Sequence, residues 1–103
     1  MDSETKARLE AAGFEFTTVR EFLGLTPEEN ELVETRVALA KLLHQLRVAS
    51  AMTQSEVAKT ARSSQSRIAR AEANDPNVSV ELLLRAVFAL GGTRRDIAQA
   101  LGG

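Results

Sequence analysis

The 103-residue sequence contains no cysteine, which excludes a disulfide framework and any metal or nucleophile site built on thiols. It also has no long apolar run, because no stretch approaches the roughly 20 apolar residues that cross a bilayer. The first residues, MDSETKARLEAAG, lack the basic segment and apolar core of a secretion signal. We therefore expect a protein of the cytoplasm that neither enters nor crosses a membrane.

The usual marks of an enzyme are also missing, since there is no glycine-rich phosphate loop, no nucleophile elbow and no set of metal ligands. His44 is the only histidine, and we expect it at the surface or boundary of a long helix rather than in a catalytic site. Four carboxylates cluster at one predicted helix start: Glu28, Glu29, Glu31 and Glu34. Such carboxylates normally complement the helix dipole, which we favour over a metal site. The sequence thus predicts no enzymatic activity, no metal and no cofactor.

Composition is ordinary for a globular chain, with 44% hydrophobic and 26% charged residues, and the length suits one compact domain. The net charge of −1 is unevenly distributed along the sequence. Residues 1–46 carry 5 Lys/Arg and 9 Asp/Glu, whereas residues 47–95 carry 8 Lys/Arg and 4 Asp/Glu. The basic second half permits nucleic-acid binding by one face, although charge alone is a weak indication.

Apolar residues recur at helical spacing and the few Pro and Gly residues lie at boundaries, so we predict an all-α fold. Thr18 and Thr26 each precede a Glu by three residues, the arrangement that caps a helix start. The second cap begins a long helix, with Pro27 at its first position, that reaches about Ala49. One face of this helix forms part of the core or a dimer seam, and it carries Leu32, Leu39, Leu43 and Leu46.

Shorter helices follow in the second half of the sequence. Thr53 caps a helix through Ala61, and Ser64 caps one that ends near Ala73. Ser79 begins a helix that Gly91-Gly92 ends, and Thr93 with Asp96 caps a last short one. We therefore divide the chain into an N-terminal extension, residues 1–30, that packs on the core or a dimer seam, and a domain of about five helices, residues 31–103.

The two short helices within residues 53–72, joined by a tight turn, have the lengths of a helix-turn-helix unit. Their inward side is apolar: Val57, Ala58, Ala61, Ile68 and Ala71. Their outward side carries hydrogen-bond donors: Ser64, Gln65, Ser66, Arg67 and Arg70. Gln bonds bidentately to adenine and Arg to guanine, so we predict base contacts from Gln65, Ser66 and Arg70. On these residues alone, a helical hairpin that merely packs is an equal alternative.

The stretches MTQSEVA, residues 52–58, and SQSRIARAE, residues 64–72, resemble the XRE-type helix-turn-helix family of phage repressors and Cro proteins. The resemblance extends over about residues 46–90, and it implies a lambda-repressor-like domain with a short helical N-terminal extension. It also implies DNA base contacts from Gln65, Ser66 and Arg70. The predicted DNA phosphate contacts are Gln54, Ser64, Arg67 and Arg62.

Two further expectations follow from the resemblance. Arg47 and Glu72 occupy positions that form a largely buried ion pair in the phage repressors, so we expect a structural ion pair here. Ala51 and Arg62 stand where the family usually has glycine. A left-handed Arg62 costs roughly 1 kcal/mol, and its guanidinium group is then placed to reach a phosphate.

The leading functional hypothesis is a prokaryotic transcriptional regulator that binds a two-fold symmetric operator as a homodimer. Its two recognition helices, residues 64–73, would enter successive major grooves about 34 Å apart. The dimer seam would come from the long helix or from the segment with Phe14, Phe16 and Phe22. The alternative is an antitoxin, as in HigA-type members of this family, whose acidic N-terminal half binds a small toxin while the protein represses its own operon.

Overall fold

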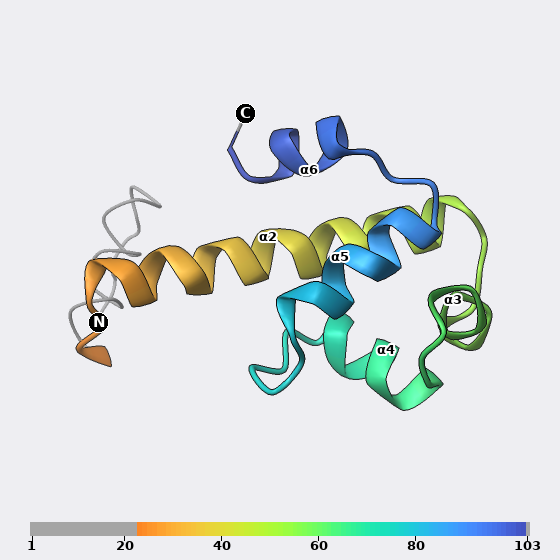
Figure 1. Ribbon diagram of the computed structural model, residues 1–103, viewed down its shortest axis with the longest axis horizontal. Helices are drawn as coiled ribbons and strands as arrows, with labels where there is room; N and C mark the ends of the chain where they lie inside the picture. Colours follow the sequence, from red (N-terminus) through yellow and green to blue (C-terminus); the bar gives the residue numbers. More distant parts are fainter. Residues whose placement is uncertain (1–22, 103) are drawn as a thin grey trace, which may run out of the picture. The chain divides into compact units, whose positions relative to one another are not determined.

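The computed structural model describes residues 23–102, and all regular elements in that range are α-helices (Figure 1). The helices are α2 (Pro27–Ala49), α3 (Gln54–Ala61), α4 (Gln65–Glu72), α5 (Val80–Ala89) and α6 (Arg94–Ala100). The chain divides into two units within α2, since one unit ends at Val33 and the next begins at Glu34. The predicted all-α fold is confirmed, whereas the cap at Thr18 and the residues Phe14, Phe16 and Phe22 lie outside the described residues.

Each described helix begins at the residue that the capping patterns predict. At the start of α2, the Glu29 N–H donates to Thr26 Oγ1 over 3.0 Å and the Thr26 N–H donates to Glu29 Oε1 over 2.9 Å. The same reciprocal pair starts α3 at Thr53 and Glu56. The remaining caps are Ser64, Ser79 and Thr93. Because these bonds satisfy N–H groups that no helix can satisfy internally, they set the first residue of each helix.

Most helix ends are closed by a residue in the left-handed conformation. After α3, Arg62 has φ 57° and ψ 51°, and the Ser63 N–H donates to the Ala58 carbonyl over 2.8 Å. The same type of closure follows α2 at Ala51 (φ 56°) and α4 at Asn74 (φ 61°). Glycine is the usual residue at this position because it has no Cβ. The chain thus keeps the backbone of a glycine-closed turn at Ala51 and Arg62, at a cost of about 1 kcal/mol for each residue.

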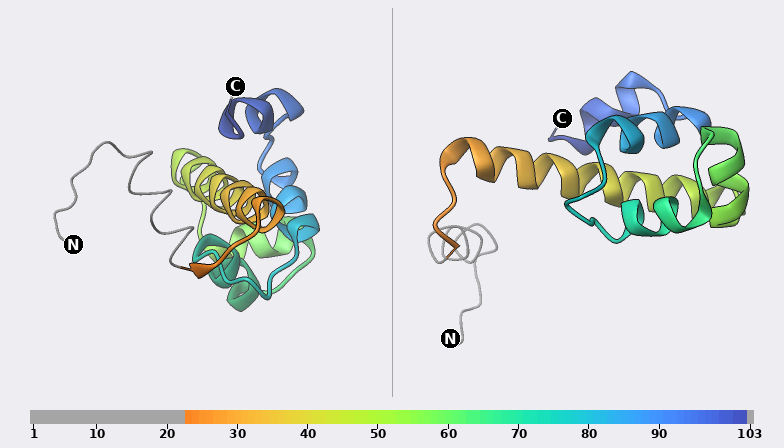
Figure 2. Two further views of the ribbon diagram at one scale, coloured as in Figure 1. Left: turned by 90° about the vertical axis from the view of Figure 1, so that its left-hand side faces the viewer. Right: turned by 60° about the horizontal axis from the view of Figure 1, so that its bottom comes forward.

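The core of the unit that begins at Glu34 is formed by α2, α3, α4 and α5. The largest fully buried side chains are Leu39, Leu43, Val57, Ile68, Leu83 and Val87. The predicted inward side of the short helix pair is buried throughout: Val57, Ala58, Ala61, Ile68 and Ala71. On α2, Leu46 packs partly against this core, but Leu32 is 53% exposed and does not join it. Figures 1 and 2 show α4 and α6 on opposite sides of α5.

Two connections on either side of α5 are held by specific contacts. The Arg36 guanidinium donates to the carbonyl of Asp75 over 3.1 Å and also to the carbonyl of Val78, which fixes the loop between α4 and α5. After α5, a Cβ on Gly92 would lie 2.6 Å from Val87 Cγ1 and 2.9 Å from the Val87 carbonyl oxygen. Only glycine fits there, so the chain can pass close to α5 before α6 begins.

Candidate nucleic-acid interface

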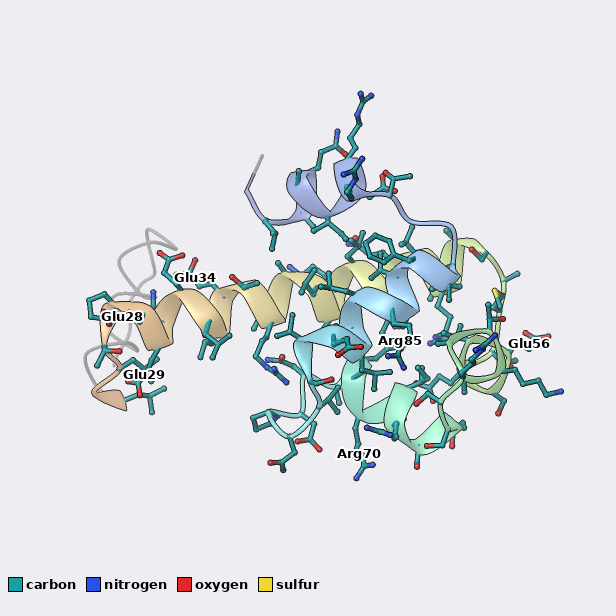
Figure 3. All side chains as sticks on the ribbon, viewed as in Figure 1. Glu28, Glu29, Glu34, Glu56, Arg70 and Arg85 are labelled. Carbon is teal, nitrogen blue, oxygen red and sulfur yellow. The ribbon has the colours of Figure 1, made fainter. Side chains whose placement is uncertain are left out.

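The outer face of α4 is exposed and carries polar side chains only. Ile68 and Ala71 are buried and anchor the opposite face of the helix in the core. The exposed side chains of this face are Gln65, Ser66, Arg67 and Arg70. Figure 3 shows Arg70 pointing away from the neighbouring helices. Within residues 23–102, neither Arg67, Arg70 nor Arg62 has an ion-pair partner, so these guanidinium groups are available to an anionic ligand.

The start of α3 lies beside the start of α4. Gln65 Nε2 donates to Gln54 Oε1 over 2.8 Å, so a predicted base contact and a predicted phosphate contact are in direct contact. A hollow of about 490 Å³ opens there, and Ala51, Thr53, Gln54 and Gln65 are among the residues that line it. Because Gln65 Oε1 accepts no bond from the described residues, the amide retains an acceptor as well as its second N–H donor. This orientation leaves one donor and one acceptor of the Gln65 amide free among the described residues.

The far end of α4 is anchored by Arg47 and Glu72, which form an ion pair. Arg47 Nε lies 2.5 Å from Glu72 Oε2, and Arg47 Nη2 lies 3.1 Å from Glu72 Oε1. The Glu72 side chain is only 7% exposed and that of Arg47 18%. Arg47 also donates from Nη1 to the Met52 carbonyl over 2.9 Å. One guanidinium group therefore joins the end of α2, the approach to α3 and the end of α4.

Glu72 also accepts hydrogen bonds that the sequence patterns did not indicate. His44 Nδ1 lies 3.0 Å from Glu72 Oε1, and Gln54 Nε2 donates to the same oxygen over 3.4 Å. Burial by itself raises the pKa of Glu72, but the bonds from Arg47, His44 and Gln54 and the charge of Arg47 outweigh burial and lower that pKa. The hydrogen bond to Glu72 raises the pKa of Arg47. The pair is thus charged at neutral pH, and Gln54 links it to Gln65.

A second hollow, of about 360 Å³, lies at the other end of the exposed face. Arg67 and Arg70 line it from α4, and Asp75, Asn77 and Val78 line it from the loop after α4. Asn77 had no sequence signal of its own, because only the fold brings this loop beside the outer face of α4. Among residues 23–102, no group of three or more His, Cys, Asp or Glu residues is arranged to hold a metal ion. The described helices also include none that is long and apolar enough to cross a bilayer.

Comparison with known proteins assigns the chain to a family. The family model described as helix-turn-helix matches residues 43–97, which is more than half of the chain and includes the whole of α3, α4 and α5. No curated protein matches the chain, and no solved structure does. The matched region contains the short helix pair, its capped turn and the exposed face of α4. The chain belongs to the XRE-type helix-turn-helix family of DNA-binding transcription regulators.

Proposed function

We propose that the chain binds double-stranded operator DNA with α4 in the major groove, where Gln65, Ser66 and Arg70 read base edges. One observation carries this proposal: the exposed face of α4 presents Arg67 and Arg70 without ion-pair partners among residues 23–102, while the opposite face is buried in the core. A rigid helix with exposed polar side chains at its N-terminal part matches the geometry by which helix-turn-helix domains reach bases. Here Ile68, Ala71 and the Arg47–Glu72 pair supply the rigidity.

The three base-reading side chains differ in what they recognise. Arg70 can donate two parallel hydrogen bonds to O6 and N7 of guanine, and Gln65 can pair with N6 and N7 of adenine. The bond from Gln65 to Gln54 supports the second assignment, because it holds the Gln65 amide before DNA arrives. A side chain that is already oriented loses less conformational entropy on binding. Ser66 has a single hydroxyl, which bonds to several bases and discriminates less.

The predicted phosphate contacts lie on both flanks of α4. Gln54 begins α3 and borders the hollow of about 490 Å³, whereas Arg62 occupies the turn between α3 and α4. Ser64 caps α4, and Arg67 is exposed one turn along it. Contacts to phosphate on either side of a recognition helix fix its register on the duplex and carry no sequence information themselves. We therefore assign Gln54, Ser64, Arg67 and Arg62 to positioning.

We further propose that two copies bind together, as a homodimer on a two-fold symmetric site. A helix of eight residues such as α4 reaches only a few base pairs, so one copy offers little affinity or selectivity. Large apolar side chains remain exposed in the unit that begins at Glu34: Val37, Val48, Phe88 and Leu101. These side chains are the candidates for a contact between the two copies. Sedimentation at micromolar concentration should show two chains per duplex, and a 1:1 complex would contradict the homodimer.

The experiment for the base-reading assignment begins with selection of a binding site from random duplexes. Fluorescence anisotropy at two salt concentrations then compares wild type with Gln65→Ala and Arg70→Ala, and with Arg95→Ala as a control for loss of one charge on α6. We expect each of the first two variants to lose about 1–3 kcal/mol of discrimination at particular base pairs while retaining salt-dependent background binding. A wild type that selects no sequence would contradict the proposal.

A further inference from the structure

A third hollow, on the side of α4 that faces α5, is lined by positive charge. It has a volume of about 230 Å³, and its lining includes Arg62 from the turn, Arg67 from α4 and Arg85 from α5. Glu81 supplies the one carboxylate of the lining, so the formal charge is +2. Figure 3 shows Arg85 pointing from α5 toward α4. Three guanidinium groups from three separate elements therefore converge on one small space.

The polar groups of this hollow are incompletely satisfied. Arg85 Nη2 lies 2.7 Å from Glu81 Oε2, but the two side chains are 51% and 77% exposed, and an exposed pair of this kind is weak. The Ser63 hydroxyl oxygen, which also belongs to the lining, is buried and has no hydrogen-bond partner among residues 23–102. A buried hydroxyl without a partner destabilises the fold unless a ligand or water supplies one. The hollow therefore has both the charge and the free donors that an anion requires.

We propose that this hollow binds a phosphate group, with Arg85 as a direct contact beside Arg62 and Arg67. Phosphate is the anion whose oxygens match the planar donors of guanidinium groups, and several arginines together form strong, charge-assisted hydrogen bonds to it. The group is a backbone phosphate of the bound duplex or a free phosphate ion. In the first case the inference rests on the proposed function, and Arg85 extends the DNA contact from α4 onto α5. Glu81 opposes the anion and limits its affinity.

Two variants with opposite expected effects test the DNA case. Arg85→Ala should weaken binding to selected and random duplexes alike, and should reduce the slope of log affinity against log salt by about 0.9, the value for one lost phosphate contact. Glu81→Gln should strengthen binding to every duplex, because it removes the opposing carboxylate. Both substitutions break the Arg85–Glu81 pair, so a purely structural role for that pair predicts changes in the same direction. Arg95→Ala, the control on α6, removes one positive charge outside the hollow and should leave the salt slope unchanged.

The source of the phosphate is decided by titrating inorganic phosphate into the protein without DNA. The readouts are the NMR signals of the Arg85 guanidinium and the Ser63 amide, with thermal melts to verify that the variants are folded. Shifts of the Ser63 amide that saturate in wild type and vanish in Arg85→Ala support a free phosphate ligand. A salt slope that depends on Arg85, without shifts from inorganic phosphate, supports a backbone phosphate.

The inference is overturned if neither the salt slope nor the phosphate shifts depend on Arg85. It is also overturned if Glu81→Gln weakens binding as Arg85→Ala does. Failure of the proposed function has a different signature: the wild type would select no sequence, but either the salt slope of its binding to random duplexes or its response to inorganic phosphate would still depend on Arg85. The two conclusions are therefore tested separately.

Discussion

Arg47 and Arg70 carry the same guanidinium group in opposite surroundings. The Arg47 side chain is 18% exposed, and it is bound to Glu72 and to the Met52 carbonyl. Arg70 lies on the outer face of α4, where it is exposed and has no ion-pair partner among residues 23–102. A largely buried, paired guanidinium holds elements together, whereas an exposed one can bind a ligand. Stability should thus depend on the first arginine and DNA selectivity on the second.

The largest expected effect comes from removing one member of the buried pair. Arg47→Met leaves the Glu72 carboxylate without its main partner in a site where Glu72 is 7% exposed, so the free energy of unfolding should fall by about 3 kcal/mol. Urea titration at neutral pH measures this loss. The double variant Arg47→Met with Glu72→Leu should recover much of it, since no charge is then stranded. If Arg47→Met destabilises the fold no more than Arg70→Ala does, the anchoring role is wrong.

The opposite pattern is expected for the exposed arginine. Arg70→Ala should leave the free energy of unfolding within about 0.5 kcal/mol of wild type, because the side chain has few contacts to lose. Its discrimination between selected and substituted base pairs should fall by about 1–3 kcal/mol. Urea titration and anisotropy on the same preparation test both halves. A uniform loss on all duplexes would instead place Arg70 on the phosphate backbone.

Arg62 combines the two behaviours, since its backbone is strained and its side chain is free. Arg62→Gly should raise the free energy of unfolding by up to about 1 kcal/mol, because glycine tolerates the left-handed conformation at φ 57°. It should also weaken binding to all duplexes through the loss of one cation. Ala51→Gly is the matched control, because it relieves similar strain at φ 56° without changing the charge. Unchanged DNA binding in Arg62→Gly would remove Arg62 from the phosphate contacts.

The smallest expected effect is the dependence of folding stability on pH. The pKa of Glu72 is lower in the folded chain than its ordinary value of 4.5, so Glu72 stabilises the fold above the unfolded-state pKa. That contribution is lost as pH falls through the folded-state pKa. The Glu72→Gln variant has an amide that does not titrate, so only wild type loses this contribution. The difference in free energy of unfolding between wild type and the variant should therefore narrow from pH 7 to pH 3. Urea titrations at the two pH values measure it, and a constant difference would contradict the lowered pKa.

The helix starts were predictable from sequence because a helix cap depends on residues that are close together in the chain. At Thr53 and at Thr93 the capping hydroxyl accepts from an N–H only three residues further along the chain. The spacing of apolar residues is also a local pattern, so it predicted which side of the short helix pair is buried. The family resemblance named Arg47 and Glu72 as partners, and their side chains are in contact.

Other contacts between residues far apart in the chain were not indicated by any sequence pattern. Arg36 reaches two carbonyls 39 and 42 residues further along the chain, and His44 reaches Glu72 across 28 residues. The convergence of Arg85 with Arg62 depends on how α5 packs beside the turn. The left-handed residues Ala51 and Arg62 could be suspected only from the family resemblance, because the glycine that normally marks such a position is absent. These features depend on tertiary packing, which overrides local preference.

The central claim is that the outer face of α4 contacts base edges while its ends are anchored. Intermolecular NOEs in a complex with the selected duplex test this most directly. The account predicts NOEs from the side chains of Gln65 and Arg70 to major-groove base protons, with none from α6. Contacts to the bases from Arg94 and Arg95 on α6, without any from α4, would contradict it.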